Sequence, residues 1–136
     1  MRRKKTPKQL IKKRLEKLVK EIVKIRDGNV CQFSGELVEG SNCHASHVIP
    51  VSADGRLAFD PLNLKVLSYH WHLNWWHKHP IAAGDWFKTK FPTRWEYLHL
   101  KHLENKTKGP ISMTEYEERE VELKDMLNSA RSAELN

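Results

Sequence analysis

The feature that most constrains the fold of this chain is an apolar stripe near its start. Between residues 7 and 26, branched apolar residues recur at alternating steps of four and three positions. This spacing predicts an amphipathic helix over residues 7–26, and Gly28 is a residue type that commonly ends a helix. Because the stripe must be covered, we expect the helix to pack on the body of the domain. The stripe consists of Ile11, Leu15, Leu18, Ile22 and Ile25.

The other face of this predicted helix is basic. Residues 1–26 hold twelve Lys and Arg and two Glu, a net charge of +10, whereas residues 27–136 hold twelve Lys and Arg and fifteen Asp and Glu, a net charge of −3. A basic arm on a mildly acidic body indicates a polyanionic partner, most simply DNA or RNA phosphates. A solvated face that only aids solubility is the alternative. The candidate phosphate contacts are Lys4, Lys5, Lys12, Lys13, Lys20 and Lys24.

Length and composition restrict the class of protein. The chain has 136 residues, enough for one compact domain, and its 39% hydrophobic and 30% charged residues are typical of a soluble globular protein. It lacks an apolar run of about 18 residues, which excludes a membrane span, and its N-terminus does not resemble a secretory signal. With only two cysteines, Cys31 and Cys43, we expect a reduced, cytoplasmic protein.

The middle of the chain predicts a β–turn–β unit followed by a helix. Residues 43–51 are typical of a strand that stops near Pro50, and a polar loop leads to a second apolar segment at residues 64–67. Ser68 is placed to cap a helix over residues 69–78. Later helices are predicted at residues 80–91, 93–103 and 112–127, the last opened by the capping box Ser112-Met-Thr-Glu115.

The predicted architecture is therefore α+β within a single domain that spans residues 1–136. A long basic helix is expected over residues 1–27, a ββα core over residues 28–79, and a packed helical part over residues 80–128. The tail, residues 129–136, is expected to fray.

Histidines are concentrated in the predicted core. Six of the eight fall between His44 and His79. Hydrolysis of a phosphodiester at a one-metal site needs a general base for water, a divalent cation on the scissile phosphate, and a group that orients the base. Neutral imidazole has a pKa suited to the base near pH 7. A strand histidine, a loop asparagine and a histidine at the start of a helix, here His47, Asn63 and His72, supply these parts.

Strand geometry separates the candidate base from the candidate ligands. Alternate strand residues point to opposite faces, so His44 and Ser46 share one face while His47 takes the other. This favours His47 as the base and His44 as a metal ligand, with Ser46 the weaker donor. His77, further along the predicted helix, is another candidate ligand. The remaining four, interpreted as ordinary core or surface residues, are His70, His79, His99 and His102.

Two other interpretations of this region stay open. A purely structural zinc site, built from the cysteines and nearby histidines, is the first alternative to a catalytic cluster. Base stacking by Trp71, Trp75 and Trp76 is the alternative to their interpretation as core residues.

Four segments, taken in order, carry a family resemblance. The basic run from residue 12 to Gly28 leads into Cys31, and Ala45-Ser46-His47-Val48 is similar to an Ala-Gly-His-aromatic segment. Residues 57–64 are similar to a Leu-Arg-Phe-x-x-x-Asn-hydrophobic segment, and Ser112-Met-Thr-Glu115 opens a charged last helix. Together these segments resemble the phage recombination nucleases of the NinG (Rap) type, within the HNH or His-Me finger superfamily. The resemblance covers about residues 8–127, nearly the whole chain.

The resemblance implies a ββα-metal fold and a metal-dependent DNA endonuclease. By position, it makes His47 the general base, Asn63 the middle Asn of the HNH set, and His72 the metal ligand on the helix. His44 falls where some relatives carry an acid, and imidazole there keeps a ligand but makes the site less anionic. Mg²⁺ or Mn²⁺ is the implied metal, with zinc as an alternative in the same site. The family also implies branched or recombination-intermediate DNA, recombination proteins as partners, and action in the cytoplasm of a bacterial host.

The chain departs from the family at one point. Relatives often carry two Cys-x-x-Cys knuckles that bind a structural zinc beside the active site. Here Cys31 is kept, but Ser34, Ser68 and Trp71 stand at the other three positions. Because four thiolates cannot be assembled, we expect this zinc to be absent and the hairpin to be held by helix packing and tryptophans.

Two rival functions come from other classes. One is a non-catalytic DNA-binding module that keeps the HNH scaffold, and the other is a histidine-rich, zinc-stabilised interaction domain. The joint presence of His47, Asn63 and His72 favours the nuclease.

Overall fold

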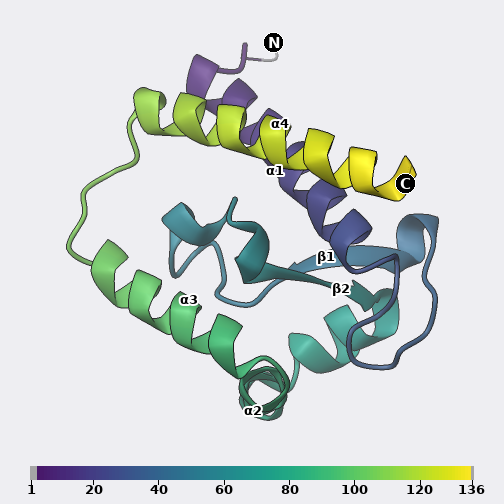
Figure 1. Cartoon of the computed structure of the whole chain (residues 1–136). Helices are drawn as coiled ribbons and strands as arrows, with labels where there is room; N and C mark the ends of the chain where they lie inside the picture. Colours follow the sequence, from purple (N-terminus) through teal and green to yellow (C-terminus); the bar gives the residue numbers. More distant parts are fainter. Residues whose placement is uncertain (1–2, 136) are drawn as a thin grey trace.

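Helices surround a two-stranded antiparallel sheet in the computed structural model, which describes residues 3–135 (Figure 1). The predicted α+β class is confirmed. In chain order the main elements are α1 (Pro7–Arg26), β1 (Cys43–His47), β2 (Leu64–Ser68), the π-helix η4 (Trp71–Trp76), α2 (Pro80–Lys90), α3 (Pro92–Asn105) and α4 (Met113–Leu135). Short 3₁₀ turns lie between them at η1 (Gly40–Asn42), η2 (Gly55–Leu57) and η3 (Pro61–Asn63).

Helix α1 has the bounds that its apolar stripe predicts. Thr6 and Gln9 form a capping box at its start: the Gln9 amide donates to Thr6 Oγ1 at 3.2 Å, and the Thr6 amide donates to Gln9 Oε1 at 2.8 Å. The chain leaves the helix through Gly28, whose φ of 63° suits glycine. Ile11, Leu15 and Ile22 of the stripe are buried, and Leu18 and Ile25 are partly buried; the neighbouring Val19 and Val23 are buried as well.

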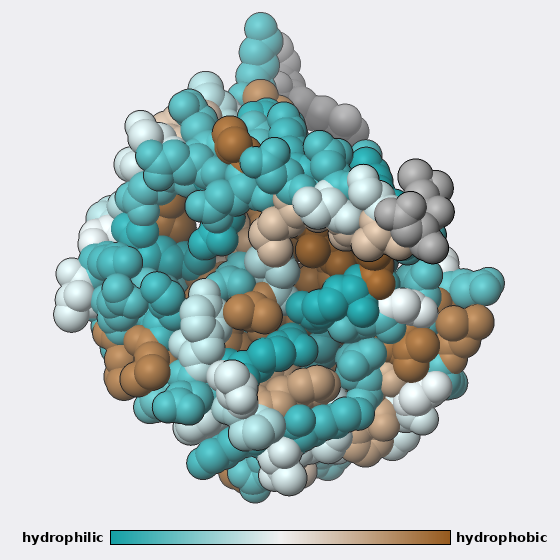
Figure 2. Space-filling view, viewed as in Figure 1, coloured by the Kyte–Doolittle hydropathy of each residue, from teal (hydrophilic) through white to brown (hydrophobic). Residues whose placement is uncertain are grey.

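Helix α1 lies between the sheet and helix α4 (Figure 1). The two helices run side by side in the same direction. Three contacts follow the two helices in order. Lys8 donates to the Ile111 carbonyl at 3.3 Å, Arg14 pairs with Glu120 at 2.6 Å, and Arg131 pairs with Glu21 at 2.7 Å. Between the helices, the α1 stripe meets Tyr116, Leu123 and Leu127 in the main core. In Figure 2 the outer surface over α4 and the start of α1 is mainly hydrophilic.

The sequence predicted that the last helix ends near residue 127 and that residues 129–136 fray. Both predictions are wrong for the residues that the structure describes. The capping box forms as predicted, with the Glu115 amide donating to Ser112 Oγ at 3.1 Å. The helix, however, continues to Leu135, and Asn136 lies outside the described residues, as do residues 1 and 2. The ion pair of Arg131 with Glu21 of α1 anchors this last part, a contact that no local pattern reveals.

The sheet pairs β1 with β2 from Cys43 opposite Ser68 to His47 opposite Leu64. The strand predicted over residues 43–51 ends early, at His47. The reason is that the Asn63 side chain takes both backbone groups of Ile49: Oδ1 accepts from the Ile49 amide at 2.8 Å and Nδ2 donates to its carbonyl at 3.0 Å. No ladder bond is left for Ile49 to make.

The predicted helix after β2 forms with a different geometry. Ser68 Oγ accepts from the Trp71 amide at 3.3 Å, as predicted, but residues Trp71–Trp76 form a π-helix with the His77 amide donating to the His72 carbonyl at 3.1 Å. In an α-helix, residues five apart point in directions about 140° apart. The wider π turn brings them onto the same side.

Helices α2 and α3 form a second, smaller core under the loop that follows β1. Phe87 of α2 and Leu98 of α3 are buried there against Leu57. Arg94 of α3 donates to the Leu64 carbonyl at 2.8 Å and thereby ties this unit to the start of β2. Within the described part of the chain, the helices lack the combination of length and apolarity needed to cross a membrane.

Candidate active site

His47 is the last residue of β1, and its half-buried imidazole has one nitrogen in a hydrogen bond. Its Nε2–H donates to the Ala58 carbonyl at 2.9 Å, so in the neutral ring the lone pair lies on Nδ1. Burial lowers the pKa of His47 below its usual value, the Ala58 bond partly opposes this, and the nearby Lys65 lowers the pKa further. His47 is therefore neutral at pH 7 and offers Nδ1 as a proton acceptor.

Asn63 is fully buried and acts on His47 through the backbone. Besides its two bonds to Ile49, its Nδ2 donates to the Leu57 carbonyl at 3.0 Å. Leu57 precedes Ala58, whose carbonyl holds the His47 ring. The sequence placed Asn63 in the catalytic set. In the structure its side chain fixes the loop whose Ala58 carbonyl holds the His47 ring, which is a positioning role.

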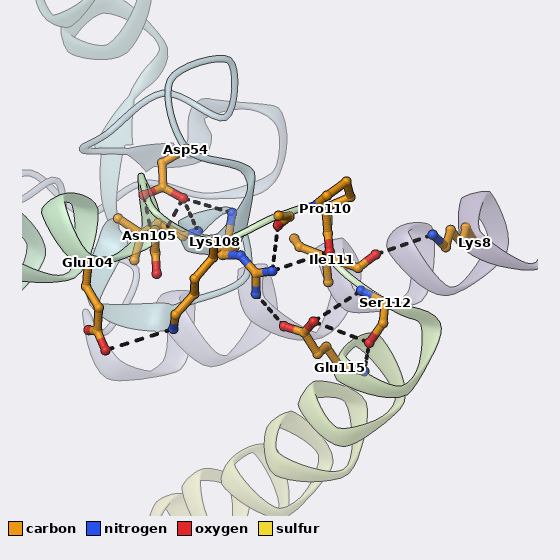
Figure 3. A network of polar contacts seen from close by, with 12 residues as sticks. Lys8, Asp54, Glu104, Asn105, Lys108, Pro110, Ile111, Ser112 and Glu115 are labelled. Carbon is orange, nitrogen blue, oxygen red and sulfur yellow. Dashed lines mark hydrogen bonds and ion pairs between the residues drawn. The ribbon is translucent and has the colours of Figure 1, made fainter.

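A second layer of polar contacts holds the same loop from outside (Figure 3). Asp54 accepts from the backbone amide of Arg56 at 2.9 Å, from His102 Nδ1 at 2.9 Å, and from Asn105 Nδ2 at 3.1 Å. Burial by itself raises the pKa of Asp54, but the bonds from His102 and Asn105 hold that pKa below its usual value. Arg56 pairs with Glu115 and donates to the Gly109 carbonyl at 2.7 Å. The loop before Ala58 is thus fastened to α3 and to the start of α4.

The three candidate metal ligands form a row of imidazoles. His44 Nδ1 lies 2.9 Å from His72 Nδ1, and His72 Nε2 lies 2.9 Å from His77 Nε2. At the far end, His44 Nε2 donates to the Ser41 carbonyl at 2.8 Å. That bond leaves His44 Nδ1 as an acceptor for His72 Nδ1–H, so His72 Nε2 carries a lone pair. The π turn, which stacks residues five apart, is what brings His77 to His72.

His72 is the most perturbed histidine of the row. Burial lowers its pKa, and the neighbouring His77 and His44 imidazoles lower it further, to about 4. At neutral pH its ring is uncharged, which is the form that binds a metal ion.

The row does not act as a single three-nitrogen site. His72 turns a different nitrogen to each neighbour, and one ion cannot bind both nitrogens of one ring. Among residues 3–135, no group of three or more His, Cys, Asp or Glu side chains has a metal-binding arrangement. The pair His72 and His77 still offers two adjacent nitrogens to an ion whose other ligands come from substrate or water. Nitrogen ligands fit Zn²⁺ or Ni²⁺ better than Mg²⁺ or Mn²⁺, which favour oxygen.

One cavity of about 720 Å³ connects His47, the candidate base, with this pair. His47, His72 and His77 all line it, with Trp76 and Trp95 on its apolar wall. His47 lies on the sheet face that α1 covers, whereas Lys65, on the other face, contacts Trp76 of η4. The cavity lining includes residues from both sides. His44 lies outside this lining and contacts His72, which is part of it.

The basic face of α1 borders the same place. Lys12, Lys13 and Lys20 line a recess of about 370 Å³ together with His47. Glu16 lines both hollows and pairs with Lys20 at 2.7 Å. Lys5 lies beside Lys13, and repulsion between the two like charges lowers the Lys5 pKa. Lys24 lies near Cys43, and Lys4 is exposed before the helix.

The four positions compared with zinc knuckles in the sequence are occupied by Cys31, Ser34, Ser68 and Trp71. Cys31 is a buried free thiol that accepts from the Ser34 amide at 3.5 Å, and Ser68 caps the turn that holds Trp71. Trp71 and Trp75 pack on Phe33 with ring centroids 4.4 and 4.2 Å away. Aromatic packing therefore holds the turn after β2 against the segment that contains Phe33.

Neither a family model, nor a curated protein, nor a solved structure matches this chain. The roles of its residues therefore rest on geometry and chemistry. Three groups in the site were missed by the sequence: the Ala58 carbonyl, Glu16 and Lys65. The sequence does single out Glu16, since it is one of only two acidic residues among the first 26. A backbone carbonyl and a buried lysine leave no such signal.

Proposed function

We propose that this protein is a metal-dependent DNA endonuclease of the HNH type, with a ββα-metal core formed by β1, β2 and η4. The observation that carries the proposal is the state of His47. Its Nε2–H is fixed by Ala58, and the ring shares one cavity with the nitrogen pair of His72 and His77. A neutral base, an ion site and a basic flank beside one cavity are the parts that phosphodiester hydrolysis requires.

The proposed reaction uses water as the nucleophile. His47 Nδ1 takes a proton from water as the water oxygen bonds to phosphorus, and the bond from phosphorus to the departing sugar oxygen breaks. The imidazolium that forms keeps its Nε2–H on the Ala58 carbonyl, which stabilises the new charge. A divalent cation at His72 and His77, when bound, supplies electrostatic stabilisation to the phosphate and the departing oxygen.

The substrate side of the proposal rests on charge and on the family resemblance. Lys12, Lys13 and Lys20 beside His47 would hold phosphates of the bound strand near the base. The NinG resemblance adds branched or recombination-intermediate DNA as the substrate, recombination proteins as partners, and the cytoplasm of a phage-infected bacterium as the place of action.

Nicking of supercoiled plasmid by the purified full-length chain tests the proposal. Mg²⁺ and Mn²⁺, implied by the resemblance, and Zn²⁺ and Ni²⁺, favoured by the nitrogen donors, are compared with a chelator. We expect metal-dependent nicking that His47→Ala lowers roughly 10²- to 10⁴-fold while DNA binding stays nearly unchanged. His99→Ala is the matched control, because His99 is exposed and stacks on Trp95 of α3.

Each alternative function predicts a different result. A non-catalytic DNA-binding module binds the plasmid but nicks it equally little with every metal and in both variants. A zinc-stabilised interaction domain has a lower melting temperature in the chelator and does not nick the plasmid. Equal nicking by His47→Ala and His99→Ala would overturn the assignment of the base.

A further inference from the structure

Lys65 is a charged side chain in the middle of the sheet with no exposed surface. It stands in β2 opposite Ser46 of β1. Lysines are almost never fully buried unless their charge is paired. None of its hydrogen-bond partners in the described structure is a carboxylate. The amine must therefore be held by something other than an ordinary ion pair.

The amine is surrounded by electron-rich groups. Lys65 Nζ lies 3.0 Å from Ser46 Oγ, 3.4 Å from the His47 carbonyl and 3.5 Å from the Ser46 carbonyl. It also lies 3.2 Å from the centre of the Trp76 ring, over its face. An ammonium has three N–H donors and is attracted to an aromatic face. All four of these groups favour a cation at Lys65 Nζ.

The charge state of Lys65 follows from two opposing effects. Burial, with the charge of Arg94, pushes its pKa well below the usual value, whereas Asp27 and Cys31 raise it. A neutral amine has only two N–H donors for the two carbonyls, the hydroxyl oxygen and the ring face, and only the Ser46 hydroxyl could donate to its lone pair. The ammonium has three donors and matches more of these groups, so the surroundings favour it against the effect of burial.

The partners of Lys65 belong to the two halves of the candidate active site. Ser46 and His47 form the end of β1 that presents the base, and Trp76 lies in η4, between the ligands His72 and His77. We propose that Lys65 is a positioning residue whose buried ammonium holds the His47 end of β1 against the helix that carries His72 and His77. Its effect on cleavage rests on the proposed nuclease function; its effect on the arrangement of the histidines does not.

Packing alone does not require the amine. Replacing a buried ion by an apolar side chain of similar volume is often neutral or stabilising, because desolvating a charge costs several kcal/mol. Methionine matches the length and unbranched shape of lysine without the charge. Lys65→Met is therefore expected to fold and to lose only the link between β1 and η4.

The charge of Lys65 also acts on the base. His47 faces Glu16 and Lys20 of α1 and Lys65 of β2. Glu16 raises the His47 pKa, whereas both lysines lower it. Removing the Lys65 charge therefore raises the pKa of His47. Because the base acts in its neutral form, the acid limb of the cleavage profile should move to higher pH.

The test compares Lys65→Met with Lys88→Met in the full-length chain. Lys88 is an exposed lysine 4.3 Å from the Trp95 ring, so it controls for loss of a cation–π contact that links α2 to α3 and not β1 to η4. NMR titration in chelator is expected to show the His47 pKa raised by about 0.5 to 1 unit in Lys65→Met and unchanged in Lys88→Met. Cleavage at saturating DNA should fall about 10- to 100-fold with KM nearly constant, since small misplacements of catalytic groups are costly.

The outcomes separate this inference from the proposed function. If the wild-type protein does not cleave DNA, the His47 titration and the His47-to-η4 contacts seen by NMR still decide the role of Lys65. An unchanged His47 pKa together with unchanged contacts or cleavage in Lys65→Met overturns it. Should that variant fail to fold, Ser46→Ala decides: loss of the hydroxyl acceptor should shift the His47 titration and lower cleavage about 3- to 5-fold, and wild-type behaviour refutes the proposal.

Discussion

Asn63 offers a direct test of how the loop that carries the base is built, whatever reaction the protein performs. Its side chain is fully buried and makes three hydrogen bonds, all to backbone groups of the loop between β1 and β2. Asn63→Ala removes all three. It leaves the amide and carbonyl of Ile49 without the partners that Asn63 provides, whereas the Leu57 carbonyl keeps its bond from the Asp60 amide at 3.3 Å.

The expected loss follows from counting those bonds. Each buried backbone group that loses its partner costs about 1 kcal/mol or more and the third lost bond is worth about 1 kcal/mol, so the expected loss in the free energy of unfolding is about 3 kcal/mol. This is a large part of the 5 to 15 kcal/mol that is typical of a domain. For a chain of this size it corresponds to a fall in Tm of about 10 °C. Asn63→Asp should be at least as harmful, because a carboxylate oxygen would face the two carbonyls.

Urea unfolding followed by circular dichroism measures the loss. Asn74→Ala is the control, because Asn74 is exposed and makes one long contact of 3.4 Å with His70. We expect the control to lie within about 0.5 kcal/mol of wild type. Nitrogen NMR of His47 should show one tautomer in wild type and a mixture in Asn63→Ala, because the Ala58 carbonyl is no longer fixed. A loss below about 1 kcal/mol with an unchanged His47 tautomer would refute this account of Asn63.

Two further predictions concern DNA binding and pH. If about four α1 lysines each replace a counterion, the logarithm of the DNA affinity should fall with the logarithm of the salt concentration at a slope of about −3 to −4. Charge reversal at Lys12 and Lys13 should flatten this slope by up to about 2, and an unchanged slope would mean that DNA binds elsewhere. The pKa of His72 falls from 6.5 to about 4 on folding, so the unfolded chain takes up the proton first. In the metal-free protein, the contribution of His72 to the free energy of unfolding should be constant above pH 6.5 and decline by about 2 kcal/mol, allowing for partial exposure, as the pH drops toward 4. His72→Gln should remove most of this decline, and an equal decline in that variant would contradict the lowered pKa of His72.

Local signals in the sequence were enough for several elements. The bounds of α1 follow from its stripe, and the start of α4 follows from Ser112 and Glu115, because a helix and its caps are made by residues within a few positions of one another. The Ser68 cap after β2 was predicted for the same reason. The sequence also marked His47, His72 and His77, which line one cavity, since residue type alone limits which side chains can accept a proton or bind a metal.

What the sequence left open depends on partners far along the chain. The early end of β1 is decided by Asn63, and the last turns of α4 are held by Glu21 of α1. The π turn that joins His77 to His72 differs from an α turn by one residue per bond, a choice that packing settles and local propensity does not. The amine of Lys65 is held by two separate elements and by the exclusion of water. Hydrogen bonding and desolvation between distant segments exist only once the chain is folded, so only the tertiary structure could decide these features.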